Sequence, residues 1–509
     1  MRLPVAFLCT VLAPCCIYAQ ALSVPWSGYG HDPQHTGNSA VAAQPLNNIH
    51  WSVPVDLNPP GGGTGNLYIH YGTPMVTAAN TVIVPVKTGA ADGFEVLAYS
   101  GSTGAQLYTL PTDYTLPVHN WIPSYGPVLS LGRRLYYPGA GGTVYYRDKP
   151  DAATGSNGQA GATGQIAFFG NALYAANQAA FNGTVQISTP LTADRSGNIY
   201  FGFIVTGANP ANLISGIARI GFTGTGTWVS ATAAAGGDNS IIQAALNCAP
   251  ALSNDQRTLY IGVSNGGEFG SGDLVSINAA TLAPVAHIQL LDPRGGIATV
   301  SSDSSASPTV GPDGDVYYGV LETACCSSHN DRGWLLHFNS ALTQTKIPGS
   351  FGWDTTASIV PSSLVASYTG HSSYLVLTKY NNYVGIGTGD GVNKVAILDP
   401  TVSALDAYSS AQVMAEVITI VGVTPEAVGG FPNAVREWCI NTAAIDPFTK
   451  SAIINSEDGV VYRWDFTTNT FTQNLRLTAG RGEAYTPTAI GTDGTAYAIN
   501  DAILFAVGR

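Results

Sequence analysis

Two short clusters of charged and aromatic residues are unusual in this chain, because charged residues make up only 10% of its 509 residues. They are Arg436-Glu437-Trp438 and the stretch that contains Arg481, Glu483 and Tyr485. An arginine beside a carboxylate and an aromatic ring can bind an acidic or hydroxyl-rich ligand. Alternatively, the arginines and acids neutralise one another in a structural network, since buried charges must be paired.

Further residues that could bind a ligand or transfer a proton recur along the sequence. They are His70, Tyr71, His119, Trp121, Asn247, Asp303, Trp353 and Asp354. In a lyase of acidic polysaccharides, Arg436 or Arg481 would neutralise the substrate carboxylate. His119 or Tyr485 would then move a proton.

Carboxylates allow a second chemistry. Asp303 and Asp354 could form the acid pair of a hydrolase, and their separation would determine the outcome of the reaction. No spacing of histidines or cysteines matches a zinc site, and Asp313-Gly314-Asp315 is a hairpin turn that needs no calcium. We therefore assign no metal ligands from the sequence.

Two segments, 322–333 and 378–394, are long for connections between paired strands, which favours a functional role. His329 lies in the first segment. It could act as a general base or as a ligand. It could equally be a solvated histidine of an exposed loop.

The first 21 residues are typical of a secretory signal peptide. Arg2 is followed by an apolar stretch over 3–18 and by Ala19-Gln20-Ala21, a cleavage pattern. A lipoprotein signal ending at Cys15 fits less well, because a proline precedes that cysteine. We expect a secreted or periplasmic protein whose mature chain, 22–509, forms one domain. No other apolar run approaches the ~20 residues that a membrane span needs.

Four cysteines remain after removal of the signal peptide: Cys248, Cys325, Cys326 and Cys439. An even number in an oxidising compartment predicts two disulfides. We favour a vicinal Cys325–Cys326 bond and a Cys248–Cys439 bond. Four unpaired buried thiols are the alternative.

A repeated spacing indicates the architecture that must position these residues. A proline precedes a tyrosine by ten positions at Pro127, Pro190, Pro250, Pro308 and Pro487. Such a recurrence is the signature of one supersecondary unit used many times. The tyrosine falls on the second strand of each unit, where its ring would pack in the core between neighbouring units.

The unit over 307–349 shows what is repeated. Short strands are expected over 307–310, 316–320 and 334–338, and a fourth over 342–347, with an Asp-Gly hairpin turn after the first. Four antiparallel strands without a helix are a propeller blade. Similar openings at Pro74, Pro127, Pro190, Pro250, Pro308 and Pro487, with weaker ones at Pro361 and Cys439, predict eight blades. Seven follow if the unit at Pro361 is an insertion.

The last unit has only three strands, and residues 49–55 have the alternation needed to supply the fourth. Pairing of this N-terminal strand with the last blade would close the ring and remove its free edges. In a closed ring, the residues that precede each inner strand converge on one face near the axis. The candidate residues named above occupy these positions, except His329, which lies in a loop between second and third strands on the same face.

Several motifs are similar to those of propellers with quinoprotein-type (PQQ-like) repeats. They are Trp26-Ser27-Gly28-Tyr29-Gly30-His31-Asp32-Pro33, the Thr103-Gly104 turn and Asp313-Gly314-Asp315-Val316-Tyr317. The resemblance covers most of the mature chain and implies the propeller fold. It also implies PQQ and calcium as possible cofactors of a quinoprotein oxidoreductase, because adjacent cysteines lie against PQQ in the alcohol dehydrogenases of this superfamily. The pair here falls in the fifth unit rather than near the chain start, so no PQQ-binding residue is assigned.

The net charge of −12 disfavours nucleic acid as a partner. We therefore expect a monomeric, exported, all-β propeller that binds a small molecule or glycan, with carbohydrate the best match to the aromatic and polar residues. A polysaccharide lyase or hydrolase using the same pocket is the alternative. A quinoprotein oxidoreductase is the third possibility.

Overall fold

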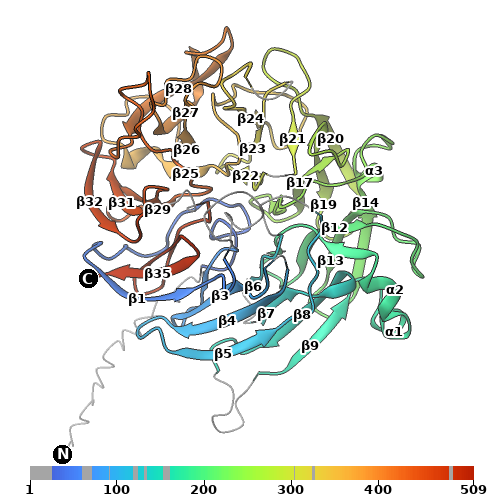
Figure 1. Cartoon of the computed structure of the whole chain (residues 1–509). Coiled ribbons are helices and arrows are strands. Elements are labelled where there is room, and N and C mark those ends of the chain that lie inside the picture. The colour runs from blue at the N-terminus through green and yellow to red at the C-terminus, as the bar shows by residue number, and fades with distance from the viewer. Residues whose placement is uncertain are drawn as a thin grey trace, which may run out of the picture.

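Eight antiparallel sheets form a closed ring in which the first blade lies beside the last (Figure 1). The structure is a computed structural model and describes residues 26–59, 72–90, 92–118, 124–130, 134–152, 161–302, 304–323, 327–480 and 485–509. The prediction of an all-β propeller with eight blades is confirmed. The weak unit at Pro361 is a complete blade.

Blades 1 to 4 cover the first half of the ring. Blade 1 contains β2 (Met75–Val76), β3 (Thr81–Lys87), β4 (Phe94–Ser100) and β5 (Gln106–Pro111). Blade 2 contains β6 (Val128–Ser130), β7 (Arg134–Pro138), β8 (Thr143–Asp148) and β9 (Thr163–Ala167). Blade 3 contains β10 (Val185–Ile187), β11 (Thr192–Ala193), β12 (Ile199–Val205), β13 (Gly216–Ile220) and β14 (Gly226–Ser230). Blade 4 contains β15 (Gln243–Ala244), β16 (Ala251–Leu252), β17 (Thr258–Ser264), β19 (Gly272–Asn278) and β20 (Pro284–Gln289).

Blades 5 to 8 complete the ring. Blade 5 contains β22 (Thr309–Val310), β23 (Val316–Val320) and β24 (Trp334–Phe338). Blade 6 contains β25 (Ser358–Pro361), β26 (Tyr374–Tyr380), β27 (Lys394–Leu405) and β28 (Gln412–Val421). Blade 7 contains β29 (Ala444–Asp446), β30 (Ser451–Asn455), β31 (Val460–Asp465) and β32 (Thr470–Arg476). Blade 8 contains β33 (Ala489–Ile490), β34 (Ala496–Asn500), β35 (Ile503–Gly508) and β1 (Asn48–Pro54).

The remaining elements are short. A separate two-stranded sheet joins β18 (Phe269–Gly270) to β21 (Val300–Ser301). The helices are α1 (Asn171–Ala176), α2 (Gln178–Asn182) and α3 (Ala231–Ala234), and the 3-10 turns are η1 (Ala140–Gly142) and η2 (Ser362–Leu364). Within the described ranges, no helix is long and apolar enough to cross a membrane.

The predicted closing strand is confirmed. β1 pairs antiparallel with β35 and becomes the outer strand of blade 8. The Trp51 ring of β1 packs beside Tyr99 of blade 1 and Tyr497 of blade 8, and its Nε1 donates to the Gly101 carbonyl oxygen at 2.8 Å. One strand therefore joins the last blade to the first.

The tyrosines of the repeated spacing are core residues, as predicted. Tyr200, Tyr260, Tyr318 and Tyr497 lie on second strands and are at most 2% exposed. A Cβ added at Gly262 of blade 4 would lie 2.4 Å from the Tyr318 hydroxyl of blade 5. The tyrosines thus fill the interfaces between neighbouring blades.

Blade 5 departs from the prediction of a fourth strand over 342–347. This stretch forms no continuous ladder with β24: the pairing here consists of an isolated bridge at Phe338–Thr345 and another just beyond the stretch at Leu335–Gly349. Pro348 has no backbone donor to continue a ladder, and its carbonyl oxygen instead accepts the Met414 amide at 2.8 Å. The long β27–β28 hairpin of blade 6 therefore covers the outer edge of blade 5.

Residues 26–47, which we call the N-terminal segment, run along the inner strands at the centre of the ring. Their backbone hydrogen-bonds to residues of seven blades, including Val76 in blade 1, Leu252 in blade 4, Val310 in blade 5 and Ile445 in blade 7. The Tyr29 hydroxyl reaches the Ser305 carbonyl oxygen, Thr356 and Asn441. The N-terminal segment therefore fills the centre of the ring from one face. For a site on the opposite face, this segment forms the floor.

Candidate functional site

Ionisable and aromatic side chains gather where the chain enters the inner strands of blades 6, 7 and 8. We call this group the axial cluster. Its members are Asp354, Lys379, Tyr383, Glu437, Cys439, Glu457 and Tyr485. The contacts described below connect them.

Lys379 and Asp354 form the deepest pair of the axial cluster. Lys379 lies on β26, and its Nζ is 3.8 Å from Oδ2 of Asp354 in the loop before β25. Each residue is 1% exposed. The other carboxylate oxygen of Asp354 accepts hydrogen bonds from the Ser305 amide and hydroxyl, both at 2.6 Å. Because Ser305 also contacts Tyr29, the pair rests directly on the floor.

Two carboxyl groups and a thiol converge beside this pair. One ligand atom from each of Glu437, Cys439 and Glu457 lies within 4.8 Å of the others. Glu457 occupies the turn between β30 and β31, where it accepts the Glu437 amide at 2.9 Å. The Cys439 thiol donates to Glu457 Oε2 at 3.2 Å. The hairpin of blade 7 and the segment before β29 thus place three ionisable groups together.

The surroundings of these groups disfavour negative charge. Burial raises the pKa of Glu437 to about 8, and repulsion by Glu457 and Glu426 adds to the rise. Burial likewise raises the pKa of Glu457, and it holds the pKa of the Cys439 thiol well above its usual value. At neutral pH, Glu437 is therefore mainly protonated and can donate a hydrogen bond.

Half-buried aromatic rings border the charged groups. The Lys379 Nζ lies 5.6 Å from the centre of the Tyr485 ring and 5.9 Å from that of Phe351. Tyr383 packs against Phe351 with ring centres 6.2 Å apart, and Trp353 is half-buried next to Asp354. The half-buried phenol rings of Tyr383 and Tyr485 therefore border the charged groups of this face.

Asp331 extends this acidic environment toward blade 5. Burial and the nearby Glu322 raise the pKa of Asp331 to about 7. The charges of Asp331 and Glu437 both act on Tyr383, whose pKa is raised chiefly by burial. Two carboxyl groups that titrate near neutral pH therefore flank one tyrosine.

Three of the predicted site residues, Asn247, Trp438 and His329, are buried and have structural roles. Asn247 is 2% exposed and joins blades through the Ser124 hydroxyl at 2.6 Å and the Ser188 carbonyl oxygen. Trp438 is 1% exposed and packs on Tyr462 and Phe471. Asn247 and Trp438 therefore belong to the packed interior rather than to an open surface.

His329 is also buried, at 0% exposure, so it is not a solvated loop residue. Its Nδ1 contacts the Gly333 carbonyl oxygen at 3.0 Å, and its Nε2 contacts Asp406 Oδ2 at 3.1 Å. The ring stacks on Trp334 at 3.8 Å. Asp406 lies in the β27–β28 hairpin, so His329 fastens that hairpin to blade 5.

Arg436 lies at the exposed rim of the cluster. Its guanidinium lies 3.7 Å from Glu426, and its side chain is 47% exposed. This contact agrees with the alternative in which arginines and acids neutralise each other. Asp354, Trp353, Glu437 and Tyr485 lie in or beside the axial cluster, as expected.

The prediction of a Cys248–Cys439 disulfide is wrong, because both cysteines are free and buried. Cys248 accepts the Gly262 amide at 3.3 Å in blade 4, whereas Cys439 bonds Glu457 in blade 7. An even number of cysteines in the mature chain therefore does not mean that these two thiols meet. The expected Cys325–Cys326 bond, the signal peptide over 1–21, and His70, Tyr71, His119, Trp121, Asp303, Arg481 and Glu483 lie outside the described residues.

The sequence did not single out Glu457 or assign Lys379 and Tyr383 to the site. Lys379 and Tyr383 belong to the long segment 378–394, whose length was a usable signal. Glu457 stands in Ser456-Glu457-Asp458-Gly459, which has the composition of an ordinary hairpin turn. Only the pairing of β30 with β31 brings it to Cys439.

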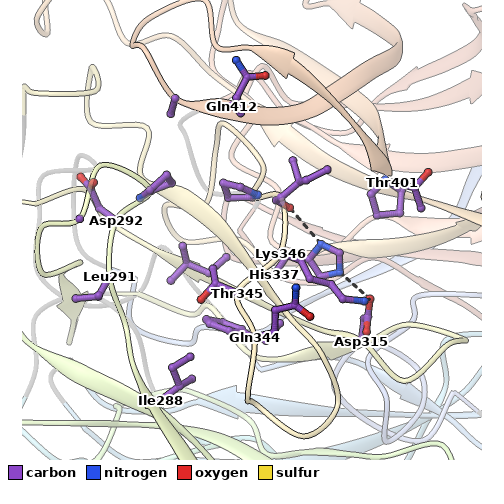
Figure 2. A pocket seen from close by; sticks show the side chains of 18 of the residues that line it. Ile288, Leu291, Asp292, Asp315, His337, Gln344, Thr345, Lys346, Thr401 and Gln412 are labelled. Carbon is purple, nitrogen blue, oxygen red and sulfur yellow. Dashed lines mark hydrogen bonds and ion pairs between the residues drawn. The ribbon is translucent and has the colours of Figure 1, made fainter.

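A groove of about 980 Å³ lies apart from this cluster, along the outer edge of blade 5 (Figure 2). Gln344 and Thr345 face it from blade 5, Ile288 from blade 4 and Gln412 from blade 6. Its ionisable groups include Asp315, which bonds both His337 and Lys346. This mutual neutralisation makes the groove a weaker candidate than the axial cluster.

The fold is that of the quinoprotein alcohol dehydrogenases. A europium-containing methanol dehydrogenase aligns with a TM-score of 0.58 and 11% identity over 94% of this chain and 89% of its own. The quinohemoprotein alcohol dehydrogenase from Comamonas testosteroni aligns with a TM-score of 0.56 and 11% identity over 96% and 81%. The enzyme ADHIIG from Pseudomonas putida HK5 gives 0.52 and 13% over 96% and 76%.

Comparison of the sequence itself finds no matching family and no matching curated protein. At identities of 11% to 13%, the structural likeness establishes the fold alone. What the protein does must therefore be argued from its own residues.

Proposed function

We propose that this protein is an exported propeller that binds a hydroxyl-rich ligand at the axial cluster, with carbohydrate as the ligand class. One observation carries the proposal: the half-buried rings of Tyr383 and Tyr485 lie beside the carboxyl groups of the axial cluster, and Tyr485 also faces Lys379. Trp353, which is half-buried too, directly precedes Asp354 in the same loop. Aromatic faces pack against the C–H faces of sugar rings, and carboxyl groups exchange hydrogen bonds with hydroxyls. The position agrees with the rule that ligands bind to loops on a rigid scaffold.

The charge of the cluster favours a neutral sugar over an acidic one. Glu426, Glu437 and Glu457 lie on this face, and Asp331 borders it. Among the described residues, the cations that act on Glu437 are Lys379 and Arg436, which face Asp354 and Glu426. A uronate carboxylate would meet more acid than base, so this geometry supports a lyase of acidic polysaccharides less well.

A quinoprotein oxidoreductase remains the candidate suggested by the fold. PQQ carries three carboxylates and needs cationic partners to balance them. In the described part of this face, Lys379 already faces Asp354, and the other ionisable groups of the axial cluster are two glutamates, a cysteine and two tyrosines. These residues do not fit the cofactor, and no redox step is derived from them.

Binding can be tested with the full mature protein and a panel of neutral and uronic-acid oligosaccharides, followed by calorimetry on the best ligand. Replacing Trp353 by alanine should weaken binding of a neutral oligosaccharide about tenfold, because one aromatic platform is worth about 1 kcal/mol or more. Trp228 on the outer strand of blade 3 is also half-buried and packs on Phe203, which makes Trp228→Ala a matched control.

The control variant should bind like the unmodified protein. Tighter binding of uronic-acid oligosaccharides than of neutral ones would contradict the charge argument. No binding to any neutral glycan, or equal affinities for both tryptophan variants, would remove the proposal.

A further inference from the structure

The convergence of Glu437, Cys439 and Glu457 has a chemical consequence beyond the binding of a sugar. Their three ligand atoms lie within 4.8 Å of one another, so small side-chain rotations would bring all three to one ion. Cys439 is 2% and Glu457 8% exposed, so the thiol and one carboxyl group are enclosed. The group is therefore a partly desolvated set of three neighbouring donors.

Glu437 is the member that the surrounding protein leaves unsatisfied. Its side chain is partly exposed, whereas those of Cys439 and Glu457 beside it are buried. Within the described part of the chain, the Glu437 carboxyl group makes no hydrogen bond and no ion pair. A partly buried carboxyl group without a protein partner is costly, and one of its oxygens lies within 4.8 Å of the ligand atoms of Glu457 and Cys439.

Among the described residues, the cations near Glu437 do not fill this role. Lys379 faces Asp354 at 3.8 Å, and Arg436 faces Glu426 at 3.7 Å on the exposed rim. A small cation placed between the three donor atoms would contact both carboxylates and the sulfur. It would also replace the repulsion between the two glutamates by attraction to a common charge.

We propose that Glu437, Cys439 and Glu457 bind one divalent transition-metal ion of the zinc type. A thiolate among the donors favours zinc, cobalt or cadmium over calcium and magnesium, which prefer oxygen ligands only. Binding releases the thiol proton to solvent as the sulfur–metal bond forms, and the carboxyl groups bind in their ionised form. Three protein ligands leave a coordination position open on the side where Glu437 reaches the surface.

This metal site goes beyond the proposed binding function and does not depend on it. The open position could hold a water molecule or one hydroxyl of a ligand, since metals of this type bind both. Because the test uses the metal alone, failure of sugar binding would leave the metal site standing. Absence of the metal would likewise leave the aromatic platform intact.

Cobalt is the best probe, because a cobalt–thiolate bond produces a charge-transfer band in the near ultraviolet. The mature protein, freed of metals with a chelator, is titrated with Co²⁺ while this band is recorded, and Zn²⁺ is then added to displace the cobalt. We expect one equivalent to saturate the band. Cys439→Ser should abolish it, and Glu437→Gln should weaken Co²⁺ binding about tenfold or more.

Cys248→Ser is the matched control, because Cys248 is also free and buried but bonds a backbone amide rather than carboxyl groups. It should keep the full band. Glu437→Gln changes the least buried of the three donors, so this variant stays informative if the cysteine variant fails to fold. No band in the unmodified protein, or a band that survives Cys439→Ser in a folded variant, overturns the site.

Discussion

The Tyr29 hydroxyl lies 2.5 Å from Oδ1 of Asn441, although 412 positions separate the two residues in the chain. The same hydroxyl contacts the Ser305 carbonyl oxygen and the Thr356 hydroxyl, each at 2.8 Å. Tyr29 thereby joins blades 5, 6 and 7 to the N-terminal segment. Ser305 in turn donates to Asp354, so the floor and the axial cluster form one hydrogen-bonded unit.

Tyr29→Phe removes this hydroxyl while keeping the ring. We expect a loss of about 1–3 kcal/mol in the free energy of unfolding, because buried acceptors lose a donor. Tyr497→Phe is the matched control, since the Tyr497 hydroxyl is buried without a hydrogen-bond partner in the described structure. Urea unfolding of both variants checks the prediction, and similar losses would contradict it.

Lys379→Met removes the ammonium group that faces the buried Asp354 carboxylate. We expect the variant to lose about 3 kcal/mol or more of stability, the usual effect of breaking a buried pair. Adding Asp354→Asn removes the charge that Lys379 balanced, so the double variant should lose less than the sum of the single variants. A double-mutant cycle by denaturant unfolding measures the coupling, and additive losses would show that the pair does not interact.

Asp406 should make stability depend on pH in the acid range. Burial opposes its ionisation, but hydrogen bonds from His329, Ser350 and Ser409 outweigh that effect and lower its pKa to about 2. A carboxyl group with a depressed pKa in the folded state contributes stability above its unfolded pKa of about 3.9. That contribution, on the order of 2 kcal/mol, is lost as the pH falls from about 4 to 2.

The acid-range prediction is checked with Asp406→Asn, which cannot titrate at this position. Unfolding by urea at pH 6, 4 and 2.5 should show a smaller loss on acidification in the variant than in the unmodified protein. The comparison cancels contributions from the other carboxyl groups. Parallel stability curves for the two proteins would contradict the assignment.

Gly104 tests the closure of the ring. Its φ of +68° favours glycine, and a Cβ added there would lie 2.6 Å from the Trp51 ring on the closing strand. Gly104→Ala should therefore destabilise the fold by about 1–3 kcal/mol through backbone strain and displacement of Trp51. Gly237 has a φ of +93° but no atom within 4 Å of an added Cβ. Gly237→Ala should therefore lower the thermal unfolding temperature less than Gly104→Ala does. Equal decreases in the two variants would mean that the contact with Trp51 does not matter.

The architecture could be predicted from the sequence because it depends on local patterns. The spacing of proline and tyrosine marks the first and second strands of a blade, and it is set by the length of a hairpin. The alternation in residues 49–55 likewise predicted the strand that closes the ring. Blade 5 is the exception, because its outer edge is covered by residues of blade 6 around Met414.

The composition of the site could be predicted only in part. Glu437, Tyr485, Trp353 and Asp354 were predicted as site residues because positions before inner strands converge in any closed propeller. The structure places Glu437, Tyr485 and Asp354 around Lys379. His329 and Trp438 have the residue types of a site but lie buried, since hydrogen bonding and packing with distant partners decided their orientation.

By itself, therefore, the sequence determined a closed propeller, with eight blades favoured over seven, tyrosines in its core and a shared closing strand. The tertiary structure alone decided which ionisable groups meet: Glu457 with Cys439 and Glu437, Lys379 with Asp354, and His329 with Asp406. The physical reason is that strand pairing follows short-range periodicity. Contacts between side chains of different loops depend instead on the angle and register at which whole blades pack.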